Sequence, residues 1–322
     1  MIWNQFMCCA FRTQCGIAAI CLTLLLTGCA CGRTPPIKGQ NAVATLEKVT
    51  LGGMEQWILV RGENTDNPIL LWLHGGPGAA QTPVARHYNG RLEQSFIVVH
   101  WDQRGAGKSN PRDFDENTMT TERFMQDTHE LTQILKQRFG KERIFLLGHS
   151  WGAQLGLQVA HRWPEDYHAY IGVGQVVDQE KGAELSYQWV LQRAREKGTR
   201  RAMRKVEQLG PPPFPEHDRY VALMKLVDSY GGGMDVGMLR MALIAFRAPE
   251  YCLGDYVRWL RGANRGSGPM WNNEGPFNAF QSAPELAIPA YFLCGRRDYN
   301  TPGLLIEHYC AELHAPAGKR TI

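Results

Sequence analysis

A run of small residues around one serine is the part of this sequence that points most directly to chemistry. Residues 148–152 read Gly-His-Ser-Trp-Gly, which places Ser150 in a G-x-S-x-G pattern. An apolar run at 143–147 precedes it and a helical pattern at 153–159 follows it, so we expect strand, sharp turn and helix. So tight a turn needs small neighbours and lifts the serine hydroxyl above the sheet edge. Ser150 is therefore the candidate nucleophile; the alternative is an ordinary glycine-rich loop.

A serine nucleophile also needs hydrogen-bond donors for the oxygen that becomes negatively charged. The backbone N–H of Trp151, directly after the serine, is one candidate donor because of its place in the turn. A second donor is expected from a glycine-rich loop after an earlier strand. Residues 74–78, His-Gly-Gly-Pro-Gly, follow the apolar run at 69–73 and fit this requirement. By themselves the same five residues could also form a simple turn.

An acidic residue that orients the base is expected after the next-to-last strand. Residues 295–302 follow the apolar run at 290–293 and contain Asp298, which is the candidate acid. The alternative role for Asp298 is to cap the helix that begins near residue 302.

The base is the member of the set that the sequence does not supply in the expected place. It should be a histidine after the acid, on the loop that follows the last strand. His308 lies in the middle of a predicted helix and His314 at its end, and that helix carries the chain away from the serine. Residues 318–322 have the pattern of an opening strand, so we expect a truncation before the loop that carries the base. Local structural roles are expected for three other histidines, His74, His149 and His217.

The elements that position these residues follow from hydrophobic patterning. A strand pair is predicted at 44–50 and 57–61. Continuous apolar runs predict buried strands, and a helix at 121–139 leads into the serine turn. The buried strands are expected at 69–73, 96–101, 143–147, 170–173 and 290–293. Strands alternating with helices predict an α/β fold with a mostly parallel sheet, helices on both faces, and a site at the carboxyl ends of the strands.

Between the last two of those strands the pattern becomes helical. Helices are expected at 185–194, 201–209, 220–230 and 238–246, separated by proline and glycine runs. We interpret this insertion as a helical cap over the carboxyl edge, where it would shape a substrate pocket. The predicted organisation is a core in two parts, at 44–175 and 285–322, with the cap at 176–284.

The first residues have the pattern of a processing signal. An apolar run at 17–26 is too short to span a bilayer but suits a signal peptide at 1–28. It ends in Leu-Thr-Gly-Cys, which resembles the bacterial lipoprotein box, with Cys29 as the acylated residue. Residues 29–43 would then be a tether, and the protein would be lipid-anchored in a bacterial cell envelope, facing the periplasm or the exterior. The alternative is a plain secretory signal.

Composition excludes other classes. The hydrophobic fraction is 44%, the charged fraction 20% and the net charge +4, without the basic blocks typical of nucleic-acid binding. Cysteines concentrate before residue 32, and the three in the body, Cys252, Cys294 and Cys310, do not form a disulfide framework or a metal site. We expect no cofactor and no metal, and the sequence leaves the oligomeric state open.

Four motifs in this order resemble the proline iminopeptidase family of α/β hydrolases: HGGPG at 74–78, DQRGAGKS at 102–109, GHSWG at 148–152 and GRRDYNTP at 295–302. The resemblance covers roughly 46–322 and implies an α/β-hydrolase fold with an inserted helical cap. It also implies that Ser150 is the nucleophile, Asp298 the acid, and Gly76 and Trp151 the oxyanion donors. The segment at 102–109 would be structural, with Asp102 and Arg104 fixing nearby loops.

The predicted cap says less about the substrate than the four core motifs say about the family. Prolyl-specific members of the family hold the free amine of the substrate with acidic cap residues, and Glu180, Glu184 and Glu274 are available, although no spacing selects one of them. His149 also stands where these enzymes often have glycine.

Three hypotheses follow. The first is a serine aminopeptidase that releases N-terminal proline or small residues from peptides, in contact with the membrane only through its lipid anchor. An esterase or amidase of the same fold is the second. The third, suggested by the missing base, is an inactive truncated product or a non-catalytic binding protein.

Overall fold

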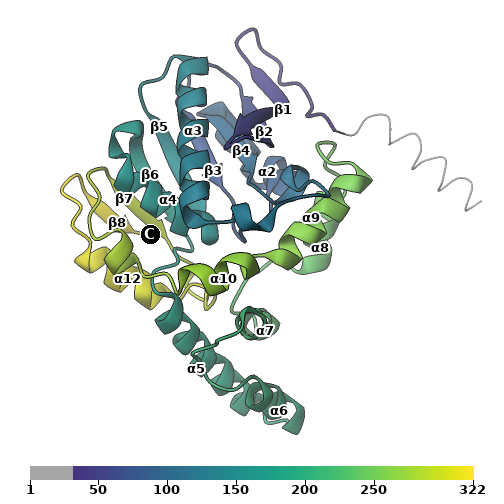
Figure 1. The fold of residues 1–322 in the computed structure, drawn as a ribbon, viewed down its shortest axis with the longest axis vertical. Coiled ribbons are helices and arrows are strands. Elements are labelled where there is room, and N and C mark those ends of the chain that lie inside the picture. Colours follow the sequence, from purple (N-terminus) through teal and green to yellow (C-terminus); the bar gives the residue numbers. More distant parts are fainter. Residues whose placement is uncertain (1–31) are drawn as a thin grey trace, which may run out of the picture.

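The computed structural model describes residues 32–322, which form an eight-stranded sheet with flanking helices (Figure 1). The strand order is β1-β2-β4-β3-β5-β6-β7-β8. The strands are β1 (Val43–Leu51), β2 (Met54–Gly62), β3 (Ile69–Leu73), β4 (Ile97–Asp102), β5 (Ile144–His149), β6 (Tyr167–Val173), β7 (Ala290–Leu293) and β8 (Lys319–Thr321). Pairing is antiparallel between β1 and β2 and between β2 and β4, and parallel at every other pair. The expected mostly parallel α/β sheet is confirmed.

The central strands are buried on both sides. Every residue of β4 is buried, and β3 exposes only part of Trp72. Because successive side chains on a strand point to opposite faces, complete burial means that both faces of the sheet are covered. The continuous apolar runs of the sequence therefore indicated these strands correctly.

Two long helices pack beside the strands that lead to the serine turn. They are α3 (Thr121–Phe139) and α4 (Trp151–Arg162), which contact each other, while α4 also lies along β3, β5 and β6. Thr120 caps α3 by accepting a hydrogen bond from the N–H of Arg123, and Gly140 ends the helix in the left-handed conformation. The other flanking helices are α2 (Thr82–Asn89), beside β4, and α12 (Gly303–Glu312), beside β8.

Seven helices lie between β6 and β7 in the described chain. They are α5 (Gln179–Lys197), α6 (Arg200–Leu209), α7 (His217–Ser229), α8 (Met238–Ala245), α9 (Leu253–Arg265), α10 (Gly268–Glu274) and α11 (Ala279–Ser282). The first three share a hydrophobic cluster of their own, which includes Val190, Val206 and Leu223. They project from the sheet, whereas α8, α9 and α10 lie along its lower edge in the view of Figure 1. The sequence patterns indicated the first four of these helices and missed the last three.

The N-terminal part of the described chain is held against the body. The backbone N–H of Gly32 donates to Pro249 O at 2.7 Å, and the Arg61 guanidinium donates to Thr34 Oγ1 and Pro35 O. These residues fall in the segment that we expected to be a tether. The signal at 1–28 and the acylation of Cys29 lie outside the described residues. Across residues 32–322, no helix combines the length and the apolarity that crossing a membrane requires.

Candidate active site

The turn that carries Ser150 has the strained geometry of a nucleophile elbow. Ser150 has φ 54° and ψ −116°, and it is the one non-glycine residue with positive φ between residues 32 and 322. Its neighbours must be glycine, because a Cβ on Gly148 would lie 2.1 Å from Gly152 O, and one on Gly152 would lie 2.1 Å from Leu73 O. Strain of this kind persists only where the surroundings impose it, and it is concentrated at functional sites.

The two expected oxyanion donors lie beside this serine. Trp151 is the first residue of α4, so its N–H has no partner inside the helix. A Cβ built on Gly75 would lie 3.3 Å from Ser150 Cβ, which shows how closely the glycine-rich loop approaches the serine. Gly76, Ser150 and Trp151 line one pocket. Such an arrangement can stabilise negative charge on the oxygen of a carbonyl group whose carbon is attacked by Ser150.

Asp298 lies next to the strand end that supports the elbow. Ser150 N donates to Val173 O at 2.9 Å, and the following residue, Gly174, is so near Asp298 that a Cβ there would lie 3.5 Å from its Oδ2. The carboxylate accepts hydrogen bonds from the N–H groups of Asn300 and Thr301 and from Thr301 Oγ1. These bonds fix the carboxylate before α12, whose own N-cap is Pro302.

His149 and His74 are held in local structure, as expected. His149 Nδ1 pairs with Gln81 Nε2 at 3.1 Å, and burial lowers the pKa of His149 although the charge of Asp298 raises it. His74 Nδ1 bonds Gly75 O at 2.7 Å, and its Nε2 accepts from Gln103 N. Burial lowers the pKa of His74 to about 4, so the ring is neutral at physiological pH.

The remaining candidates for the base make contacts with other residues. His308 pairs with Glu312 at 2.7 Å on the exposed side of α12. His314 joins the 284–286 segment through its backbone, and His217 pairs with Ser267 in the insertion. From residue 32 to residue 322, no histidine is hydrogen-bonded to Ser150 Oγ or to the Asp298 carboxylate.

A further hollow lies beside Asp298. It measures about 630 Å³ and is lined by Asp298, Cys294, Thr321 and Ile322, among others. Ile322 continues the pairing of β8 with β7, because its N–H donates to Phe292 O and its C=O accepts from Cys294 N. Because β7 and β8 are parallel, the C-terminal end of β8 lies at the same edge of the sheet as Asp298, which follows β7.

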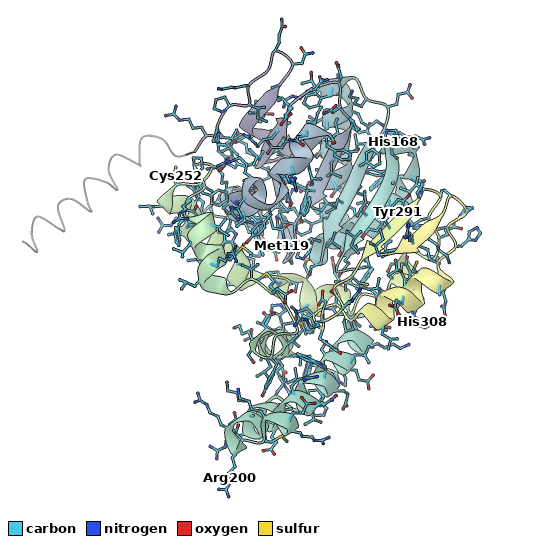
Figure 2. All side chains as sticks on the ribbon, turned by 180° about the vertical axis from the view of Figure 1, so that it is seen from behind. Met119, His168, Arg200, Cys252, Tyr291 and His308 are labelled. Carbon is cyan, nitrogen blue, oxygen red and sulfur yellow. The ribbon has the colours of Figure 1, made fainter. Side chains whose placement is uncertain are left out.

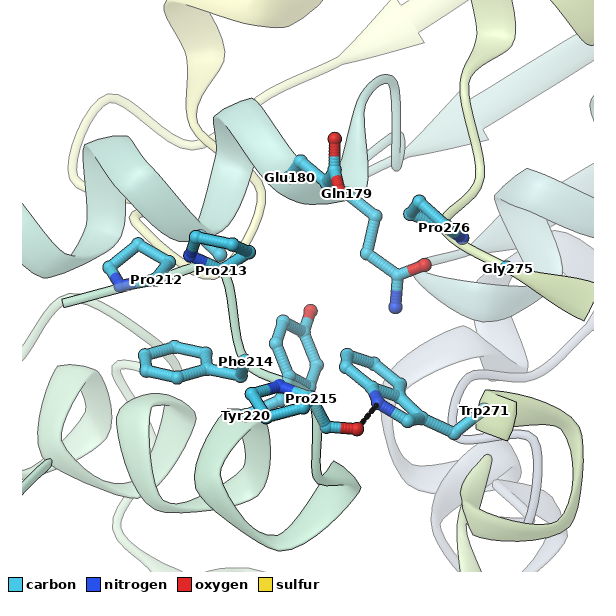
Figure 3. A pocket seen from close by; sticks show the side chains of 11 residues that line it. Gln179, Glu180, Pro212, Pro213, Phe214, Pro215, Tyr220, Trp271, Gly275 and Pro276 are labelled. Atoms are coloured by element: carbon cyan, nitrogen blue, oxygen red, sulfur yellow. Dashed lines mark hydrogen bonds between the residues drawn. The ribbon is translucent and has the colours of Figure 1, made fainter. Parts of the chain in front are cut away.

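The pocket at Ser150 adjoins a second hollow beside α7. The first measures about 100 Å³ and the second about 220 Å³, and both are lined by Gln179, Tyr220 and Trp271. Figure 3 shows the second hollow, with the Tyr220 ring beside the Trp271 indole, whose N–H donates to Pro215 O. The sequence analysis did not identify these three residues, and the two aromatic ones, Tyr220 and Trp271, resemble ordinary core residues in sequence.

The three acidic residues considered in the insertion, Glu180, Glu184 and Glu274, differ in which hollow they line. Glu274 lines the pocket that contains Ser150, and its carboxylate accepts hydrogen bonds from Thr121 N and Thr121 Oγ1. Glu180 lines only the second hollow, and Figure 3 shows its carboxylate turned away from the Tyr220 ring. Glu184 is exposed and lines neither hollow.

The segment at 102–109 forms a buried polar network around the glycine-rich loop. Arg104 pairs with Asp127 at 2.9 Å, with side chains 3% and 0% exposed. Asp102 accepts from Thr82 Oγ1 and Lys108 N, and burial raises its pKa. Gln103 donates from its backbone and side chain to His74. This is the loop-fixing role that the sequence suggested for the segment.

Two features differ from or extend the sequence analysis. Cys252 is disulfide-bonded, whereas the sequence analysis treated the three body cysteines as unpaired; Cys294 and Cys310 are free thiols. In the part of the chain that the structure describes, no group of three His, Cys, Asp or Glu side chains could hold a metal ion.

Known proteins are similar to this chain in sequence and in fold. Residues 82–221 match the family model described as "Serine aminopeptidase, S33". The protein named "Probable aminopeptidase YbaC" of Bacillus subtilis is 31% identical over 283 residues, 87% of this chain and 89% of that protein. A "Probable proline iminopeptidase" of Streptomyces coelicolor is 40% identical, over 29% of this chain and 28% of its own length.

Solved structures confirm the α/β-hydrolase fold. The proline iminopeptidase-related protein of Thermus thermophilus superposes with a TM-score of 0.59 at 23% identity, covering 87% of this chain and 89% of that one. The proline iminopeptidase of Mycobacterium smegmatis gives a TM-score of 0.57 at 19% identity, covering 86% and 90%.

Proposed function

Because the chain belongs to the serine aminopeptidase S33 family of α/β hydrolases, we propose that it is a serine-dependent aminopeptidase that releases N-terminal proline or small residues from peptides. One observation carries the proposal: Ser150, in a strained turn, lines one pocket together with Gly76, Trp151 and Glu274. The relatives with aminopeptidase and proline iminopeptidase names support the substrate class.

In the proposed reaction, Ser150 Oγ attacks the carbonyl carbon of the first peptide bond. The N–H groups of Gly76 and Trp151 bind the oxyanion of the tetrahedral intermediate. A histidine takes the serine proton and passes it to the leaving amine, and Asp298 orients that histidine. We propose that this histidine lies on a segment after Ile322, where the end of β8 adjoins the hollow beside Asp298. Water then hydrolyses the acyl-enzyme.

Glu274 is the proposed anchor for the free amine of the substrate. Glu274 lines the Ser150 pocket, and its carboxylate accepts hydrogen bonds from Thr121, whereas Glu180 lines only the more distant hollow and Glu184 is exposed. The test compares Glu274→Gln with the matched control Glu184→Gln in a chain continued past Ile322. For prolyl arylamide we expect Glu274→Gln to lower kcat/KM by about tenfold to a hundredfold, the loss of one charge-assisted hydrogen bond. An equal loss with an acyl ester that has no amine would contradict the anchor role.

The second candidate function is an esterase or amidase on the same site. The observation that favours it is His149, which stands in the elbow where prolyl-specific enzymes often have glycine. Profiling prolyl and alanyl arylamides against short acyl esters separates the two functions. Cleavage of esters without any cleavage of arylamides would overturn the aminopeptidase proposal, whereas a catalytically silent continued chain would favour the non-catalytic alternative.

We also propose that Cys29 is acylated and holds the protein in a bacterial cell envelope. The support is the Leu-Thr-Gly-Cys sequence after an apolar run. Cys29→Ser should shift the protein from the membrane fraction toward the soluble fraction, measured by fractionation and by metabolic labelling with a fatty acid. Labelling that persists in the variant would contradict the assignment.

A further inference from the structure

Helices α8 and α9 expose six large apolar side chains. On α8 and the residue after it, Leu239, Leu243 and Phe246 are 77%, 51% and 62% exposed. On α9, three more are exposed by more than half, namely Leu253, Val257 and Leu260. Soluble monomers seldom expose so many large apolar residues together, and such patches mark interaction sites. We name these six residues the α8/α9 apolar face.

The spacing shows that this face is organised. In both helices the exposed residues recur at i, i+4 and i+7, which places them on one side of the helix. The other side of α9 faces the core, where Asp255 pairs with Lys108 and a Cβ on Gly262 would meet Gly105 O at 2.6 Å. The two helices abut at Phe246 and Tyr256, whose ring centroids are 4.7 Å apart. The two outward stripes are therefore neighbours.

The exposed charged residues of the two helices have one sign, and one of them, Arg258, pairs with the buried Asp255 at 2.6 Å. The exposed charged residues between 238 and 262 are all arginines: Arg240, Arg247, Arg258 and Arg261. The two acidic residues of this stretch, Glu250 and Asp255, are 1% and 4% exposed and therefore hardly reach solvent. An apolar stripe bordered by arginines is the pattern of a helix that lies in the interface of an anionic bilayer.

The N-terminal end of the described chain reaches the same place. Gly32 and Arg33 donate backbone hydrogen bonds to Pro249 O, in the connection between α8 and α9, and Thr34 Oγ1 donates to Glu250. Figure 2 labels Cys252, just before α9, beside the start of the described chain. The described chain therefore begins at the edge of the apolar face.

We propose that the α8/α9 apolar face docks onto the surface of an anionic phospholipid bilayer, with its leucines, valine and phenylalanine among the acyl chains and its arginines at the phosphates. This contact goes beyond the proposed hydrolase function and does not require acylation of Cys29. It also extends the sequence expectation, in which a lipid anchor made the only membrane contact. None of the six residues lines the hollows around Ser150, so the face is distinct from the substrate pocket.

The direct test is hydrogen–deuterium exchange of the full chain. It is measured with vesicles of phosphatidylglycerol and phosphatidylcholine, with vesicles of phosphatidylcholine alone, and without vesicles. We expect slower exchange across 238–265 with the anionic vesicles, a smaller effect with the neutral ones, and no change across 217–229. Unchanged exchange at 238–265 with anionic vesicles would overturn the proposal. So would equal protection without vesicles, which would indicate a second copy or residues 17–26 on this face.

Vesicle co-sedimentation tests the side chains. In a Cys29→Ser background, the variant Leu243→Ser/Phe246→Ser/Val257→Ser should bind anionic vesicles at least about tenfold more weakly, because each substitution removes apolar area from the contact. Leu304→Ser on α12, a residue 66% exposed outside the face, is the matched control and should bind like the parent. Equal binding of the triple variant and the control would contradict the proposal, and so would a triple variant that only changes from dimer to monomer in gel filtration.

Discussion

At the scale of single residues, the geometry at Ser150 depends on how closely backbones approach one another. Gly152 leaves room for the end of β3, where any side chain would meet Leu73 O at 2.1 Å. We therefore expect Gly152→Ala to lower the free energy of unfolding by about 3 kcal/mol or more, as overpacking of backbone does. Gly90→Ala is the control, since Gly90 has nothing within 4 Å of its Cβ position and φ −55°. Urea denaturation measures both, and equal destabilisation would contradict this packing.

Two buried histidines predict how stability depends on pH. Burial lowers the pKa of His74 to about 4 and that of His100 to about 3, from an ordinary value of 6.5. Below pH 6.5 the unfolded chain binds protons that the folded chain does not, so folding stability is fully present above pH 6.5 and falls as the pH drops toward 4.

At pH 5 the expected loss is about 2 kcal/mol for each of these histidines. His100→Gln should flatten the profile between pH 7 and pH 5, and the exposed His308→Gln should leave it unchanged, both measured by chemical denaturation. A His100→Gln profile as steep as that of the parent would show that His100 accepts its proton without opening the fold.

Motif residues could be predicted at this scale because their geometry is local. The turn around Ser150 is determined by the five residues that form it and by the strand and helix on either side. Tyr220 and Trp271 lie in the same pocket only because α7 and α10 return over the sheet. No spacing in the sequence encodes that return, so these residues could not be found from the sequence.

At the scale of elements, a buried ion pair fixes α9 to the segment at 102–109. Lys108 and Asp255 are 2.7 Å apart and each is 5% exposed. Asp255→Asn leaves the lysine charge buried without its partner, so we expect a loss of about 3–5 kcal/mol in unfolding free energy. Breaking the exposed pair Arg162–Glu122 with Glu122→Gln should cost less than about 1 kcal/mol. If Asp255→Asn and Glu122→Gln lower the free energy of unfolding equally in thermal or urea denaturation, burial does not determine how much an ion pair contributes.

Helix α9 differs from the elements that the sequence predicted well. The helix at 121–139 and the strands at 69–73 and 290–293 were predicted to the residue, because their apolar periodicity records burial. In α9 the apolar residues Leu253, Val257 and Leu260 face solvent, while Gly262 and Asp255 face the core. Its inward contacts depend on a distant loop, which a local window cannot contain.

At the scale of the whole molecule, the chain combines an α/β-hydrolase core with the α8/α9 apolar face. The α/β-hydrolase core positions Ser150, Gly76, Trp151 and Asp298, and the helices between β6 and β7 shape the pocket above them. In the proposed mechanism the base is a histidine at the hollow beside Asp298. Removing a member of such a triad typically lowers turnover by about 10⁴ to 10⁶. We therefore expect hydrolase activity to depend on a histidine at the hollow beside Asp298.

The most direct test of this claim is labelling by a fluorophosphonate, with the adduct located by peptide mass spectrometry. It compares residues 1–322, a chain continued by a strand end, loop and histidine from a related hydrolase, and the continued chain with Ser150→Ala. We predict fast labelling of the continued chain at Ser150, labelling slower by several orders of magnitude for residues 1–322, and none at this position for Ser150→Ala. Fast labelling of residues 1–322 that His308→Ala or His314→Ala abolishes would contradict the account, because one of these residues would then be the base.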